Sequence, residues 1–372
     1  HHMPWFQCPN CDRIVTGLVC GSGPRNEEAI SKTHCCLKCQ NGDGHDTYWC
    51  AGVPKTMWRE IQIAGTEQCA HYLLHTPNSD EGVAFPRPAI LFLHGAATYH
   101  WPESLLEQTE VLRTKNTISR SCWLIAPFGT YEEPLAIPSS GKSRKKKKDR
   151  YGNDILYVEE FDIERVWLTF LGACQELGQS QVDMARLYAV GVSMGAQGLW
   201  DLAAWHGSQL AAVAPMAGKL SWKACTDQRR NLSELSRLPI RSFAHCEDET
   251  SYELQDWSWV AEQRMKTMSS CRVAPEEIVR DVGEGRELHV HSWSDCLQLH
   301  LLHGKGDRHN VWDPVFSQEE VFELFTWMVE QRSCSAGSEV AGSSSAAPTA
   351  SREVGKRWRD LEDSRWCDPG PA

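Results

Sequence analysis

The stretch RLYAVGVSMGAQGLWDLAAWHG (residues 186–207) decides the fold. Its first half is a continuous apolar run typical of a buried strand, and its second half carries apolar residues at helical spacing. Ser193 lies between the halves, with Gly191 and Gly195 two residues away on either side. A serine exposed on a tight strand-to-helix turn needs small residues there, because side chains would collide with the strand and the helix. We therefore interpret Ser193 as a nucleophile; the alternative is that the glycines only let two elements pack closely.

The whole chain has the composition of an acidic globular protein. Its 372 residues carry a net charge of -11 and are 41% hydrophobic, which argues against a nucleic-acid binder and against a disordered chain. No apolar run approaches the length of about 20 residues that crosses a bilayer, and no apolar segment of a signal peptide follows the first residues. Many of the sixteen cysteines are scattered singly, as thiols are in a reducing compartment. We expect a cytoplasmic protein with no membrane span.

Composition divides the chain into three regions. Residues 1–56 are rich in cysteine and poor in apolar runs, so this segment needs metal or covalent links to fold. Residues 57–332 alternate strand-like and helix-like patterns, which predicts an α/β domain with a mostly parallel sheet and helices on both faces. Residues 333–372 form a Ser/Ala/Gly-rich tail that we expect to be disordered.

Apolar patterns place several elements within the main domain. Residues 162–178 have helical spacing, with Asp162 as the N-cap and Gly178 as the stop. Residues 318–331 read as one amphipathic helix that ends the domain. Continuous apolar runs typical of strands buried on both faces lie at residues 89–95, 122–129 and 186–193.

The segment GKSRKKKKDR (residues 141–150) interrupts this pattern with a cluster of basic residues. A positive patch on an acidic protein can attract anionic surfaces or serve as a nuclear-targeting signal. We favour the alternative of a solvated loop, because blocks of like charge repel one another.

A serine nucleophile needs a base, an acid that orients the base, and donors for the oxyanion. The N–H of Met194, directly after the serine at a helix N-terminus, is one expected donor. The second is expected from the small residues after the apolar run 89–95, where we assign Ala96. We interpret His94, at the end of that run, as a structural hydrogen-bonding residue.

The base and the acid should follow Ser193 along the chain, in the order acid and then histidine. His309 lies in a loop before the last predicted helix and is our choice as the base, with His303 as its main rival. Asp248 directly follows an apolar run and is our choice as the acid, with Glu247 as its rival. The alternative for both carboxylates is a solvated loop.

Three blocks of this sequence resemble the esterase and phospholipase-like branch of the α/β-hydrolase superfamily, close to poly(3-hydroxybutyrate)-depolymerase-like esterases and predicted peptidases. Residues 182–218 are similar to that family's strand, serine turn, helix and following strand. The segment LPIRSFAHCEDE (residues 238–249) is similar to its strand before the catalytic acid, which implies Asp248. LHLLHGKGDRHNVWDPVF (residues 299–316) is similar to its last strand and base loop, which implies His309. The resemblance covers residues from about 85 to 330.

The sequence departs from the family pattern at three places near these residues. Ala196 and Cys246 stand where the family usually has glycine, and Arg308 replaces the glycine before the base. These changes leave the three predicted catalytic residues intact, but an arginine beside the base is expected to narrow the entrance to the site.

The cysteine-rich start predicts a structural zinc site. The expected ligands are Cys36, Cys39, His45 and Cys50, because thiolates and imidazole close a tetrahedral zinc site that supplies folding energy to a short segment. The alternative is a set of disulfides or free thiols. This segment is also a possible contact for a protein partner.

Together these patterns predict a serine hydrolase that needs no cofactor for catalysis. It would cleave a small-molecule or lipid-like carboxylic ester through an acyl-enzyme. The same residues also cleave thioesters and amides, so a thioesterase and a peptidase remain alternatives. A third alternative is an inactive hydrolase-fold adaptor with a zinc-binding module.

Overall fold

The central strands of the sheet are built around continuous apolar runs. In the computed structural model, every residue of β5 (Arg87–Leu93), β6 (Trp123–Phe128) and β12 (Ala212–Met216) is buried. β11 (Val182–Val192) is buried throughout its second half. A parallel strand between two layers of helices is covered on both faces, so its sequence does not alternate. The predicted strands are confirmed.

The structure describes a little more than half of the chain. The described residues are 5–7, 13–16, 52–63, 69–78, 84–96, 102–128, 136–137, 146–148, 154–156, 160–218, 235, 237–248 and 274–333.

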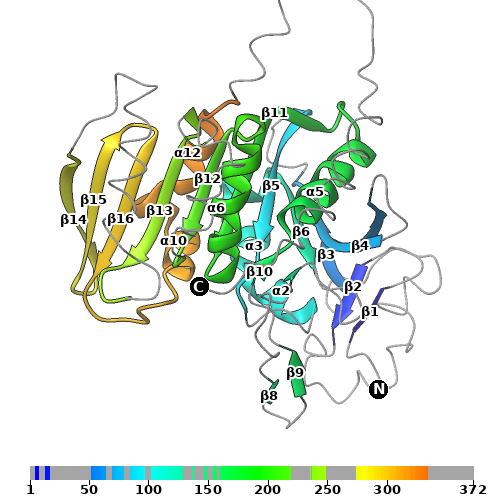
Figure 1. Cartoon of the computed structure of the whole chain (residues 1–372), viewed down its shortest axis with the longest axis horizontal. Helices are drawn as coiled ribbons and strands as arrows, with labels where there is room; N and C mark the ends of the chain where they lie inside the picture. The colour runs from blue at the N-terminus through cyan, green and yellow to red at the C-terminus, as the bar shows by residue number, and fades with distance from the viewer. Residues whose placement is uncertain are drawn as a thin grey trace, which may run out of the picture.

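One large sheet organises these residues, with the strand order β1-β2-β3-β4-β6-β5-β11-β12-β13-β16-β15-β14 (Figure 1). The strands from β6 to β16 in this order run parallel, and the outer strands on both sides pair antiparallel. The outer strands and the two remaining central strands are β1 (Trp5–Gln7), β2 (Arg13–Thr16), β3 (Gly52–Gln62), β4 (Cys69–His75), β13 (Ile240–His245), β14 (Glu276–Gly283), β15 (Arg286–Ser294) and β16 (Leu297–His303).

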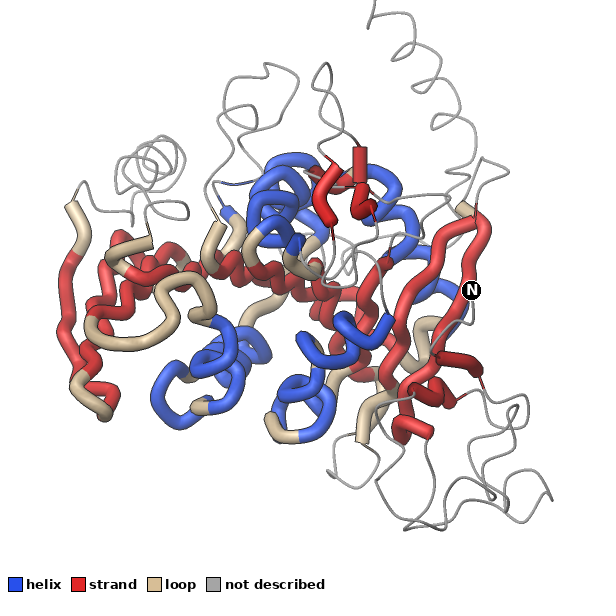
Figure 2. The backbone as a smooth tube through the Cα atoms, turned by 90° about the horizontal axis from the view of Figure 1, so that it is seen from below, coloured by secondary structure: helices blue, strands red, loops and turns tan. Residues whose placement is uncertain are grey.

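Helices cover both faces of this sheet, as Figure 2 shows. α5 (Ile163–Leu177) and α6 (Met194–His206) pack on one face and share one hydrophobic cluster with it. The helices on the other face share a second cluster and are α2 (Pro102–Gln108), α3 (Glu110–Thr114), α4 (Thr117–Arg120), α10 (Trp312–Ser317), α11 (Glu319–Phe322) and α12 (Leu324–Glu330). Of the helices in the described ranges, none is long and apolar enough to cross a membrane.

α5 begins and ends where the sequence predicts. The Asp162 side chain accepts a hydrogen bond from the Arg165 N–H at 3.1 Å, which caps the first turn. Gly178 follows the last turn with a φ of 85°, a value that favours glycine.

The predicted single helix at residues 318–331 is wrong, because it breaks between α11 and α12 at Glu323. Glu323 has a φ of 49°, in the left-handed region. The Glu319 carboxylate accepts hydrogen bonds from the N–H groups of Phe325 and Thr326 and so caps α12. Arg241 of β13 donates to the Glu323 carbonyl at 3.0 Å. These contacts satisfy the groups that the break exposes, and an amphipathic pattern does not reveal them.

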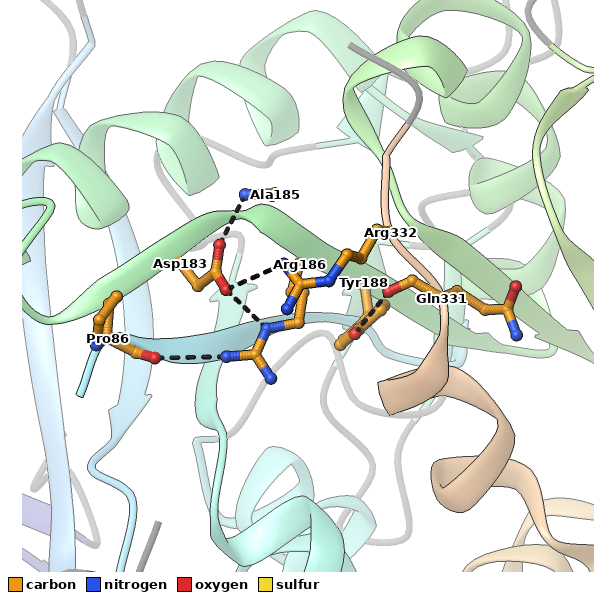
Figure 3. Close-up of polar contacts among 7 residues, drawn as sticks. All are labelled: Pro86, Asp183, Ala185, Arg186, Tyr188, Gln331 and Arg332. Carbon is orange, nitrogen blue, oxygen red and sulfur yellow. Dashed lines mark hydrogen bonds and ion pairs between the residues drawn. The ribbon is translucent and has the colours of Figure 1, made fainter. Parts of the chain in front are cut away.

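Polar contacts hold the segment after α12 against β11 (Figure 3). The Tyr188 hydroxyl donates to the Gln331 carbonyl at 3.1 Å, and the Ser333 N–H donates to the Ala185 carbonyl at 3.0 Å. Asp183 accepts a hydrogen bond from Arg186 at 2.6 Å and lies 3.8 Å from Arg332. The last described residues are therefore fixed to the central sheet.

The basic segment (residues 141–150) contains a short strand. β8 (Lys146–Lys148) pairs antiparallel with β9 (Asp154–Leu156), and a second small pair joins β7 (Ala136–Ile137) to β10 (Glu160–Phe161). A strand therefore occupies three of the residues for which we expected a solvated loop.

The expected zinc ligands Cys36, Cys39, His45 and Cys50 lie outside the described residues. β1 and β2 extend the main sheet through β3, and β3 crosses the expected boundary between residues 56 and 57. In the ranges that the structure describes, no group of three metal-ligating side chains is arranged to hold a metal ion.

Candidate active site

Ser193 forms the whole turn between β11 and α6. β11 ends at Val192 and α6 begins at Met194, so the serine alone changes the direction of the chain. Its φ of 53° and ψ of -116° are strained for a residue with a side chain, at a cost of about 1–3 kcal/mol. The Ser193 N–H donates to the Met216 carbonyl of β12 at 2.8 Å, which helps to hold this conformation.

The two glycines beside Ser193 permit the turn because the backbone is crowded on both sides. A Cβ atom at Gly191 would lie 2.4 Å from the Gly195 carbonyl oxygen. A Cβ atom at Gly195 would lie 2.1 Å from the Leu93 carbonyl oxygen of β5. Neither distance is possible for a real side chain, so the sequence pattern has a steric cause.

The structure brings Ser193, His309 and Asp248 together in one hydrogen-bonded chain. His309 Nε2 lies 2.8 Å from Ser193 Oγ, and His309 Nδ1 lies 2.7 Å from Asp248 Oδ2. The Asp248 side chain is only 6% exposed, whereas the His309 side chain is 44% exposed. The carboxylate is thus screened from water while the imidazole can reach a bound molecule. We call this arrangement the Ser193–His309–Asp248 chain.

Local hydrogen bonds shape the loop that carries His309. This loop follows β16, and Asp307 Oδ1 accepts hydrogen bonds from the N–H groups of His309 and Asn310 at 3.0 and 3.2 Å. The rings of Trp312 and His309 pack perpendicular to each other, with centroids 5.7 Å apart and planes at 89°. The Asp307 turn and Trp312 together orient the ring.

Buried His245 connects the Asp248 loop to the His309 loop. Its Nδ1 accepts a hydrogen bond from the Glu247 N–H at 3.1 Å, so Nε2 carries the proton and donates to the Gly304 carbonyl at 3.2 Å. The Cys246 N–H also donates to the Leu302 carbonyl of β16 at 3.0 Å. Sequence reasoning missed this role of His245; the available signal was a histidine that ends a strand just before the predicted acid.

Glu247 and His303, the alternatives for the acid and the base, contact other residues. Glu247 Oε2 lies 2.8 Å from Arg308 Nε, so this carboxylate pairs with the arginine. The ring of His303, at the end of β16, lies 3.9 Å from the ring of His289 on β15. Neither residue joins the Ser193–His309–Asp248 chain.

The expected oxyanion donors come from two different segments next to the serine. Met194 begins α6, and Ala96 follows Gly95 in the loop after β5. A Cβ atom at Gly95 would lie 3.5 Å from Ser193 Cβ, which places this loop against the nucleophile. Among the described residues, neither the Met194 N–H nor the Ala96 N–H has an acceptor.

His94 stabilises the loop after β5, as expected. It is buried, and its Nδ1 donates to the Gly95 carbonyl at 2.9 Å. Burial lowers the pKa of His94 to about 4, so it is neutral near pH 7.

Comparisons with protein-family models and with curated proteins find no match to this chain. Solved structures with a similar arrangement include a thermostable esterase, with 16% identity, a TM-score of 0.47 and coverage of 75% of this chain. The match spans 63% of that esterase, less than two thirds of its length. An acetyl xylan esterase from Aspergillus awamori has 13% identity and a TM-score of 0.46, with 73% of this chain and 99% of that chain covered. An S-formylglutathione hydrolase from Agrobacterium tumefaciens has 12% identity and a TM-score of 0.42, with 74% and 95% covered.

These likenesses are distant, with identities of 16% or less and TM-scores below 0.5. The molecule's own features are more specific: the parallel central strands, the serine turn between β11 and α6, and the order of serine, acid and histidine along the chain. This combination is typical of the α/β-hydrolase fold.

Proposed function

We propose that this protein is a serine hydrolase that cleaves carboxylic esters through an acyl-enzyme. The single observation that carries the proposal is the Ser193–His309–Asp248 chain, in which both imidazole nitrogens lie within hydrogen-bond distance of their partners. A serine hydroxyl is a weak nucleophile near neutral pH, and a base at this distance is what activates it.

Each residue has one proposed role. Ser193 Oγ attacks the acyl carbon while His309 Nε2 takes its proton, and Asp248 holds the ring in the tautomer with hydrogen on Nδ1. The bond to the leaving alcohol then breaks as His309 returns the proton to the alcohol oxygen. Water repeats the sequence on the acyl-enzyme, which releases the carboxylic acid and restores Ser193.

The proposed oxyanion donors are the N–H groups of Met194 and Ala96. The dipole of α6, which begins at Met194, favours negative charge at this point. Donors that are already in place cost no reorganisation when the charge develops on the carbonyl oxygen.

Covalent labelling with a fluorophosphonate probe tests the proposal. We expect the wild-type protein to be labelled on Ser193 and the Ser193→Ala variant to remain unlabelled. Absence of labelling in the wild type, or equal labelling of both proteins, would contradict the proposal and favour an inactive adaptor.

Substrate class is tested separately. We expect turnover of p-nitrophenyl esters, measured over a series of acyl-chain lengths, to exceed turnover of a thioester and of a peptide anilide. Faster cleavage of the anilide would change the proposed activity to that of a peptidase.

The zinc site in residues 1–56 is a separate proposal. We propose that Cys36, Cys39, His45 and Cys50 bind one structural zinc ion that takes no part in the hydrolysis. Metal analysis of the reduced full-length protein should give at least one equivalent of zinc, and the Cys36→Ser/Cys39→Ser variant should lose it. Less than one equivalent in the wild type would contradict the site.

The cytoplasmic location also remains a prediction. Cys122 and Cys174 are buried and unbridged, and burial raises the pKa of each thiol to about 12. Thiols of this kind are stable in a reducing compartment and react slowly elsewhere.

A further inference from the structure

Gln108, the last residue of α2, contacts the loop that carries the proposed oxyanion donor Ala96. Its Oε1 accepts a hydrogen bond from the Gly95 N–H at 3.1 Å. Because a backbone N–H can only donate, this contact fixes the orientation of the side-chain amide. The amide nitrogen Nε2 is therefore the end of the group that does not contact the Gly95 N–H.

Nε2 lies on the same side of Gly95 as the nucleophile. The Cβ atom that a side chain at position 95 would have lies 3.5 Å from Ser193 Cβ and 3.6 Å from Gln108 Nε2. The two atoms thus border one small space, and glycine at position 95 leaves that space open.

Nε2 is also an unused donor. It has no hydrogen-bond acceptor in the described part of the chain, whereas Oε1 of the same amide is occupied. Gln108 itself is only partly buried. A donor with this exposure beside the nucleophile can bind an acceptor atom of a ligand at little desolvation cost.

We propose that Gln108 contacts the substrate. Its Nε2 donates a hydrogen bond to the carbonyl oxygen of the acyl group, and this hydrogen bond is retained as negative charge develops on that oxygen. Oε1 meanwhile holds Gly95, and hence Ala96, in place. The inference rests on the proposed serine hydrolase function and deepens it. Gln108 would be a side-chain oxyanion donor that acts with the N–H groups of Met194 and Ala96.

Two variants separate contact with substrate from support of the loop. Gln108→Glu keeps an oxygen that accepts from the Gly95 N–H but has no N–H donor, whereas Gln108→Met lacks both. If Nε2 stabilises the oxyanion, both variants should lower kcat for a p-nitrophenyl ester by about 10–100-fold, with KM changed by less than about threefold. If Gln108 only supports the loop, Gln108→Glu should keep at least half of the wild-type kcat, and that result would overturn the proposal.

Gln197→Glu is the matched control for the added negative charge. Gln197 is exposed in the first turn of α6, so its glutamate carries the same charge near Ser193 without touching the Gly95 loop. A loss of kcat in Gln197→Glu as large as in Gln108→Glu would mean that charge alone explains the effect, and would also overturn the proposal. The comparison is repeated at high salt, which screens a distant charge but does not replace a missing donor.

Failure of this inference is distinguishable from failure of the proposed function. Fluorophosphonate labelling of the wild type that depends on Ser193 supports the function irrespective of Gln108. Wild-type kcat in both Gln108 variants of such a labelled enzyme would overturn only the role of Gln108. Unfolding temperatures of the variants, measured in parallel, show whether each is folded when kcat is recorded.

Discussion

Arg308 and Glu247 form an ion pair, with Nε 2.8 Å from Oε2. These are the residues directly before His309 and Asp248, so the pair joins the loop of the proposed base to the loop of the proposed acid. Both side chains are more than half exposed, and such pairs contribute only about 0–1 kcal/mol to stability. The arginine that replaces the family's glycine is thus directed to the neighbouring loop.

This ion pair leads to a prediction that distinguishes the role of Asp248 from that of Glu247. Asp248→Asn should lower kcat by about 10³–10⁴-fold, because the amide no longer selects the required tautomer of His309. Glu247→Gln should lower kcat by less than about threefold, because it removes only an exposed ion pair. Ester hydrolysis by the two purified variants provides the measurement, and the reverse order would transfer the role of acid to Glu247.

A second prediction concerns the close contact at Gly195. Gly195→Ala should lower the free energy of unfolding by about 1–3 kcal/mol and abolish most of the activity, because its Cβ would meet the Leu93 carbonyl oxygen at 2.1 Å. Gln197→Ala, on the exposed side of the same helical turn, should change stability by less than about 0.5 kcal/mol. Urea unfolding of both variants tests this, and equal stabilities would show that the turn can relax.

A third prediction concerns stability in acid. Burial, with smaller contributions from Arg113 and Lys55, lowers the pKa of His75 to about 3, and burial lowers that of His94 to about 4. Below a pH of about 6.5 the unfolded chain binds a proton at each histidine that the folded protein does not bind, so stability is lost as pH falls toward 4.

Each of these histidines should add about 1.4 kcal/mol per pH unit to that loss. In urea unfolding between pH 7 and pH 4.5, we expect the free energy of His75→Gln to depend less steeply on pH than that of the wild type. Identical pH dependences would mean that His75 binds its proton over the same pH range in the folded and the unfolded protein.

A fourth prediction concerns Arg241, which is buried below the break at Glu323. Arg241 Nε donates to Gln298 at 2.9 Å, and the guanidinium lies 4.6 Å from the Trp327 ring centroid. Arg241→Met leaves the Glu323 carbonyl without this donor and should destabilise the fold by about 2–3 kcal/mol. The half-exposed Arg280, 3.7 Å from Glu323, provides the control, and Arg280→Met should cost less than about 1 kcal/mol.

Thermal or urea unfolding of both variants measures the difference. A cost for Arg241→Met no larger than that for Arg280→Met would mean that Glu319 alone maintains the break.

The sequence by itself determined the features that depend on neighbours along the chain. The buried strands β5 and β6 follow from continuous apolar runs, and α5 follows from helical spacing between Asp162 and Gly178. The turn at Ser193 was predictable because both glycines that it needs lie within two residues of the serine, although the backbone that crowds Gly195 is the distant Leu93 carbonyl.

Only the tertiary structure decided the contacts between residues far apart in the chain. Ser193 and His309 are separated by 116 positions, and the sequence left His303 and Glu247 as rivals until the sheet placed the ends of β13 and β16 side by side. The break at Glu323 and the position of Gln108 beside Gly95 were not predictable, because Arg241 and the loop after β5 come from other parts of the chain. Local patterns fix the conformation of a segment, whereas a site depends on which segments the packed sheet brings within hydrogen-bond distance.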